Sequence, residues 1–274
     1  MLWQTTSIAS PVDRQPHHDI ARPDRMQSPE RGVSSKKTTG FVPWRQIARV
    51  KAISGADGPR CFFHNPPSGK MMSALDLHGA RTGNSLRASL ALAESGLPFR
   101  AIPVKLGDGE HRRAPFLAIN PLGKVPAMVI DDGHGPWVLT QSAAIMLEVA
   151  RRSGGRLMSP NPRDAAVSLE RFFYFLTDVM GPSHAGFALR QHGMTDAAAH
   201  LDELVGVRIR DAEAFLRRTP WMGGTQFSIA DIAAFVLVRA NAGAVDFDAH
   251  PALGEWVERI GARPATRLGL SAFG

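Results

Sequence analysis

The chain has 274 residues, long enough for two domains or one large one. Its formal net charge is +7, but residues 1–72 carry eleven Lys and Arg against five Asp and Glu, whereas the remainder has 21 basic against 20 acidic residues. A basic balance can indicate nucleic-acid or membrane partners. Because the excess lies in the front segment and the remainder shows no basic stripe or recognition helix, the sequence predicts neither kind of partner.

Residues 1–72 are rich in Pro, Ser, Arg and His and contain no sustained apolar periodicity. Such a segment cannot bury enough apolar surface to offset the entropy of ordering, so we expect a disordered basic extension. The alternative is an over-extended start, with the working protein beginning at Met71 or Met72. The segment lacks the apolar core of a secretory signal. The single cysteine, Cys61, excludes an internal disulfide framework and fits a reducing compartment.

Residues 73–152 alternate between strand and helix patterns. The clearest helical pattern places Leu86 and Leu90 on one face and ends at Gly96. The predicted elements are a strand at 75–78, a helix at 85–95, a strand at 99–105, a polar loop with a short helix at 107–118, strands at 127–130 and 137–139, and a helix from 141. This order resembles a thioredoxin-like domain, with a right-handed parallel crossover and a closing hairpin.

Residues 153–274 read as helical throughout. Apolar residues between Leu201 and Leu216 recur at helical spacing, which indicates packing rather than a cofactor site. Ser228 and Asp231 have the spacing of a helix capping box ahead of an apolar run, and we expect that pair to serve folding rather than chemistry. No histidine has partners at metal-ligand spacing, so no metal is expected.

Two motifs carry the most information, namely Asn-Pro-Leu-Gly-Lys-Val-Pro at 120–126 and Thr-Gln-Ser-Ala-Ala-Ile at 140–145. Alone, the first could be a common turn and the second a helix cap. An outward-facing Val125 backbone could instead pair with the main chain of a bound peptide, and Ser142 at a helix N-terminus could hold a carboxylate. In this order and spacing, the two motifs resemble the glutathione-binding pair of the cytosolic glutathione transferase family.

The resemblance implies a thioredoxin-like N-terminal domain at 73–152 and an α-helical bundle C-terminal domain at 153–274. It also implies an enzyme that conjugates the thiolate of glutathione, its co-substrate, to an electrophilic small molecule. It further implies a cis peptide before Pro126, a cytoplasmic homodimer, and glutathione-binding roles for Lys124, Val125, Pro126, Gln141 and Ser142.

The thiolate donor of this family lies in the turn after the first strand or at the start of the first helix. There the sequence reads Thr82-Gly83-Asn84, which resembles the Thr-Pro-Asn of the nu class, within a chain that is nu-like or theta-like. The resemblance implies catalytic roles for Thr82 as thiolate donor and Asn84 as second donor. Ser85 is the competing donor, and Ser85 or Asn84 could instead cap the helix.

Two other functions stay open. The nu-like turn favours glutathione-dependent disulfide reduction or peroxidase chemistry at the same site. The other open function is that of a non-catalytic glutathione-fold protein that acts by binding another protein. The identity of the electrophile cannot be read from the sequence.

Overall fold

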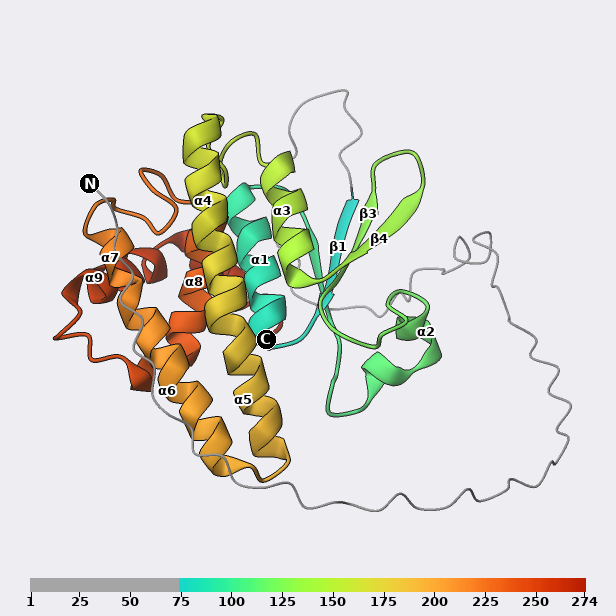
Figure 1. Ribbon diagram of the computed structural model, residues 1–274. Coiled ribbons are helices and arrows are strands. Elements are labelled where there is room, and N and C mark those ends of the chain that lie inside the picture. Colours follow the sequence, from blue (N-terminus) through green and yellow to red (C-terminus); the bar gives the residue numbers. More distant parts are fainter. Residues whose placement is uncertain (1–73) are drawn as a thin grey trace, which may run out of the picture. The chain divides into compact units, whose positions relative to one another are not determined.

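The computed structural model describes residues 74–274 (Figure 1). The front segment at 1–72, with its expected disorder, lies outside the described residues. The helices and strands are β1 (Ala74–Gly79), α1 (Gly83–Ser95), β2 (Arg100–Pro103), a 3-10 turn (Glu110–Arg112), α2 (Ala114–Leu117), β3 (Ala127–Asp131), β4 (Pro136–Thr140), α3 (Ser142–Arg152), α4 (Pro162–Tyr174), the π-helical segment η3 (Phe175–Met180), α5 (Gly181–Gln191), α6 (Thr195–Asp211), α7 (Glu213–Leu216), α8 (Ile229–Ala240), a second 3-10 turn (Ala242–Ala244), α9 (Pro251–Gly261) and α10 (Pro264–Leu270).

The strands form one sheet in the order β2-β1-β3-β4. β1 pairs in parallel with β2 and antiparallel with β3, and β3 pairs antiparallel with β4. Met128 lies between Leu77 on β1 and Leu139 on β4. The parallel crossover and closing hairpin confirm the predicted thioredoxin-like topology. The first helix begins two residues earlier than its apolar pattern suggested, because Thr82 supplies the N-cap.

Apolar side chains bury both faces of the sheet. On one face Met128 and Ile130 of β3 join the main core, where α1 packs against α3. On the other face, Ala127 packs with Val104 and with Phe116 of α2. The alternation of neighbouring residues between the two faces follows from the twofold period of a strand. Figure 1 shows α1 and α3 beside the sheet and α2 on the far side of it.

The chain after α3 is helical, as the sequence predicted, and shares its core with the sheet half. α8 is buried along nearly its whole length and packs against α1, α3 and α4. Its N-terminus carries the expected capping box of Ser228 and Asp231. The C-terminal α10 packs on α1, and Gly269 comes close enough that a Cβ would lie 2.7 Å from the Leu90 Cα. None of the helices described between residues 74 and 274 is long and apolar enough to cross a membrane.

Candidate functional site

A pocket of about 60 Å³ joins the two sequence motifs. It is lined by Asn84, Asn120, Leu122, Lys124, Val125, Pro126, Thr140, Gln141 and Ser142. These residues come from the start of α1, the loop before β3, and the junction of β4 with α3. The structure therefore brings together all the residues expected to bind glutathione, and adds Asn84 from the predicted donor turn.

The loop before β3 presents its backbone to this pocket. The peptide between Val125 and Pro126 is cis, as the resemblance implies. The N–H and C=O of Val125 make no hydrogen bond within residues 74–274, so both can pair with an extended peptide. Lys124 next to it is exposed.

Asn120 fixes this loop, a role that sequence analysis did not assign. Its buried side chain donates to the Lys124 carbonyl at 2.5 Å and accepts the Leu122 N–H at 3.2 Å. Gly123 between them has φ 60°, and a Cβ there would come within 3.0 Å of the His111 carbonyl oxygen. The Asn-Pro-x-Gly turn signal in the sequence pointed to this loop, but only the fold shows what the Asn side chain clamps.

The junction of β4 with α3 forms the second wall. Gln141 is the N-cap residue of α3, and its φ of 70° with ψ of 118° makes it the one non-glycine residue with positive φ among those described. Thr140 before it ends β4. Ser142 opens α3 and is mostly buried. The first N–H groups of a helix lack intrahelical partners, so this wall suits an anionic group.

The donor turn places Thr82, Asn84 and Ser85 differently. The Thr82 Oγ1 accepts the Ser85 N–H at 3.3 Å and donates to the Ser85 Oγ at 3.1 Å, and Thr82 does not line the pocket. Ser85 is buried, and its Oγ also accepts the Ala80 N–H at 3.3 Å. Asn84 faces the pocket, where its Oδ1 accepts the Ser142 hydroxyl at 3.3 Å. The geometry thus brings Asn84, rather than Thr82 or Ser85, against the second motif.

Arg87, one turn further along α1, is a site neighbour that sequence analysis missed. It is 1% exposed, and its guanidinium donates to the Asn84 Oδ1. Burial lowers its pKa to about 10, which still leaves it charged at neutral pH. An arginine at i+3 from a candidate site residue, on the same face of the predicted helix, was the available signal.

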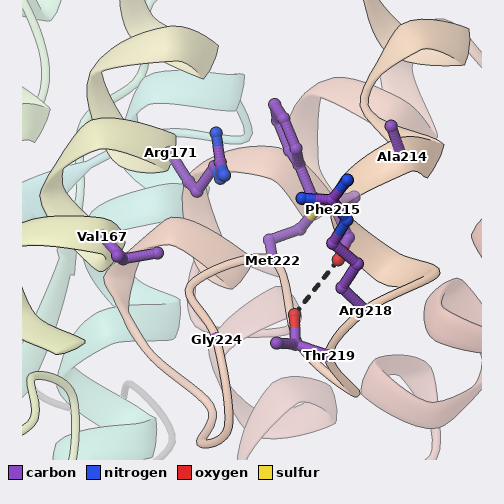
Figure 2. Close-up of a pocket in the computed structure, with 8 residues that line it drawn as sticks. All are labelled: Val167, Arg171, Ala214, Phe215, Arg218, Thr219, Met222 and Gly224. Carbon is purple, nitrogen blue, oxygen red and sulfur yellow. Dashed lines mark hydrogen bonds between the residues drawn. The ribbon is translucent and has the colours of Figure 1, made fainter.

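A larger pocket of about 310 Å³ lies in the helical half of the chain. It shares no residue with the 60 Å³ pocket that joins the two sequence motifs, which we call the motif pocket. Figure 2 shows its lining, with Val167 and Arg171 on α4 opposite Phe215 of α7. The Arg171 guanidinium lies 3.7 Å from the Phe215 ring centroid, and Thr219 Oγ1 donates to the Phe215 carbonyl at 3.1 Å. No predicted site residue lies there. Among residues 74–274, no three His, Cys, Asp or Glu side chains gather in an arrangement that could hold a metal ion.

Comparison with known proteins agrees with this site. A family model described as glutathione S-transferase, N-terminal domain, matches residues 83–152. The disulfide-bond oxidoreductase YfcG of Escherichia coli K12 is 34% identical over 203 residues, covering 70% of this chain and 92% of the relative. Glutathione S-transferase 3 of Zea mays is 33% identical over 218 residues, covering 74% of this chain and 96% of the relative. A crystal structure of a Pseudomonas putida glutathione transferase, with one glutathione disulfide bound per subunit, is 25% identical with a TM-score of 0.66, covering 73% of this chain and 92% of that one.

Proposed function

This chain belongs to the glutathione transferase family as a glutathione-dependent enzyme, and we propose that the motif pocket holds the glutathione whose thiolate attacks a small electrophile. The observation that carries this proposal is the convergence of Asn84, Val125 and Ser142 on one pocket from three separate segments. We also propose a cytoplasmic location, which the single cysteine supports.

The two motifs suit the two ends of a short peptide. The unbonded Val125 N–H and C=O would pair with the main chain of the cysteinyl residue. Ser142 and the N-terminus of α3 would hold the γ-glutamyl carboxylate, with Gln141 as a polar neighbour. The exposed Lys124 ammonium would pair with the glycyl carboxylate.

The reaction requires the thiolate, because a thiol with a pKa of about 8.5 is mostly protonated at neutral pH. One charge-assisted hydrogen bond of roughly 1.5–3 kcal/mol would lower that pKa by about one to two units. We assign this task to Asn84 and Thr82. The Asn84 Nδ2 has no partner among the described residues, whereas the Thr82 hydroxyl would have to turn away from Ser85.

Calorimetric titration with glutathione tests the binding site. Ser142→Ala should weaken glutathione affinity by roughly 1–3 kcal/mol, because a carboxylate loses a donor at a helix N-terminus. Ser271→Ala is the matched control, since Ser271 is exposed, caps the end of α10 and lies outside the pocket. Equal dissociation constants for wild type and Ser142→Ala would show that Ser142 does not bind the γ-glutamyl carboxylate.

Disulfide reduction is the second candidate function. Two findings favour it: the 34% identical relative named as a disulfide-bond oxidoreductase, and the glutathione disulfide bound in the Pseudomonas putida structure. The only cysteine of the chain lies in the segment before residue 74, so no described side chain could attack a disulfide and a glutathione thiolate would have to do so. Turnover of a mixed disulfide compared with turnover of an aromatic halide separates the two reactions. Glutathione binding without either turnover would favour a non-catalytic role.

We further propose a homodimer that pairs the sheet half of one subunit with the helical half of the other. Large apolar side chains are exposed on both halves. Leu122, which lines the motif pocket, is 69% exposed, and Phe173 on α4 and Phe187 on α5 are 49% and 60% exposed. Light scattering at micromolar concentration should give a dimer mass for the wild type and a monomer mass for Leu122→Asp. A monomeric wild type would contradict this proposal.

A further inference from the structure

Arg87 is a buried cation without a counter-charge. Its NH2 group donates to the Asn84 Oδ1 and contacts the Met180 Sδ at 2.7 Å, while its Nε has no hydrogen-bond partner. No acidic side chain among residues 74–274 forms an ion pair with it. The charge of Arg87 acts on His184 of α5, whose pKa is lowered by burial and by that charge. A neutral histidine cannot offset the positive charge.

Such a charge is costly in a folded protein. Removing a guanidinium from water is unfavourable unless an anion or a full set of acceptors replaces the lost hydration. Here the acceptors are one amide oxygen and one thioether sulfur. Perturbed buried charges of this kind mark functional sites more often than arbitrary positions. Arg87 contacts Asn84, which lines the motif pocket, so a negative charge bound in that pocket would lie close to the guanidinium.

The contacts of Asn84 fix the orientation of its amide. The Oδ1 accepts from both Arg87 and Ser142, which are donors. A flipped amide would place its own N–H groups against the guanidinium of Arg87, which can only donate, and this contact excludes the opposite orientation. The Nδ2 is therefore the group left to face a ligand, and it has no partner among residues 74–274.

We propose that Arg87 is a positioning residue with two effects on bound glutathione. It orients the Asn84 side chain so that its N–H points at the glutathione sulfur, and its own positive charge offsets the negative charge of the thiolate. This inference rests on the proposed glutathione site. In it, Asn84 is the direct donor, and Arg87 acts through Asn84 and through its uncompensated charge.

Ultraviolet titration of the bound thiolate tests the inference on the full chain saturated with glutathione. Arg87→Met should raise the pKa of the bound thiol by about one unit and lower the rate at neutral pH about tenfold. Arg87→Lys keeps the charge but not the planar contact to Asn84, so its shift should be smaller. Arg163→Met is the matched control, because it makes the same substitution at an exposed arginine of α4 outside the motif pocket and should leave the titration unchanged.

S-methylglutathione separates positioning from a general loss of structure. It carries no ionisable thiol, so its affinity should be the same for wild type and Arg87→Met. An equal loss of affinity for glutathione and S-methylglutathione would overturn the inference in favour of a structural role. The double variant Arg87→Met with Asn84→Ala should shift the pKa by less than the sum of the two single shifts, since part of the effect of Arg87 passes through Asn84. Additive shifts would refute action through Asn84.

Asn84→Asp keeps the inference testable if Arg87→Met does not fold. A carboxylate at this position neutralises Arg87, so the melting temperature should rise, yet it cannot donate and repels a thiolate, so the thiol pKa should return toward its free value. A lower melting temperature or an unchanged thiol titration would overturn the inference. If wild type binds no glutathione at all, the proposed function fails instead, and this outcome is visible before any Arg87 variant is measured.

Discussion

Asp231→Asn should destabilise the fold strongly while leaving the motif pocket intact. The Asp231 carboxylate is fully buried and accepts four hydrogen bonds. Its Oδ2 accepts the Ser228 N–H at 2.9 Å and the Ser228 hydroxyl at 3.2 Å. Its Oδ1 accepts the Met222 N–H at 2.8 Å and the Trp256 Nε1–H at 2.9 Å. An asparagine would turn an NH2 group toward one of these donor pairs.

Two buried hydrogen bonds would then be lost, each at a cost of about 1–3 kcal/mol, so the expected loss is roughly 2–6 kcal/mol. That is a large part of a typical total of about 5–15 kcal/mol. Urea unfolding at pH 7.5 measures it, with the exposed Asp164→Asn of α4 as the control, expected within about 0.5 kcal/mol of wild type. A loss below about 1 kcal/mol for Asp231→Asn would refute the reasoning from these four donors.

The same carboxylate predicts a pH dependence, because burial raises the pKa of Asp231 to about 6. The buried site favours the protonated acid over the carboxylate, so ionisation costs stability as the pH rises from about 4 to about 6. Wild type should therefore lose stability relative to Asp231→Asn across that window, and parallel curves would contradict this. Gly269→Ala should lower the melting temperature, since its Cβ would meet the Leu90 backbone, whereas Gly261→Ala on α9, with nothing within 4 Å, should be neutral or stabilising. Equal melting temperatures would show that α10 can shift away. Gln141→Gly should keep or raise the melting temperature by relieving a strained φ, yet weaken glutathione binding through the lost side chain, which thermal unfolding and calorimetry report separately.

The sequence predicted the walls of the site because each wall is a local motif. Val125 and Pro126 belong to one turn, and Gln141 and Ser142 to one strand-to-helix junction, so short segments carried most of the information. The topology followed for a similar reason, since the order and periodicity of the elements restrict a sheet of this size to few arrangements. What the sequence left open was the side of the pocket built from the first helix.

That side depends on cap geometry and on distant contacts. Whether Thr82 or Asn84 faces the pocket depends on which residue begins the helix, and boundaries read from a pattern can be displaced by two or more residues. Arg87 was missed because arginine is rarely buried, and here its guanidinium contacts Met180, 93 residues away in the chain. No local pattern encodes that contact.

Ser142 adds a constraint that couples the two ends of the proposed ligand. A hydroxyl has one hydrogen to donate, and in this structure Ser142 donates it to the Asn84 Oδ1 at 3.3 Å. If Ser142 donates to the γ-glutamyl carboxylate instead, Asn84 loses that partner and keeps only Arg87. The orientation of Asn84 then depends on Arg87 in the complex more than in the free protein. The effect of an Arg87 substitution should accordingly be larger on the ionisation of bound glutathione than on the stability of the empty site.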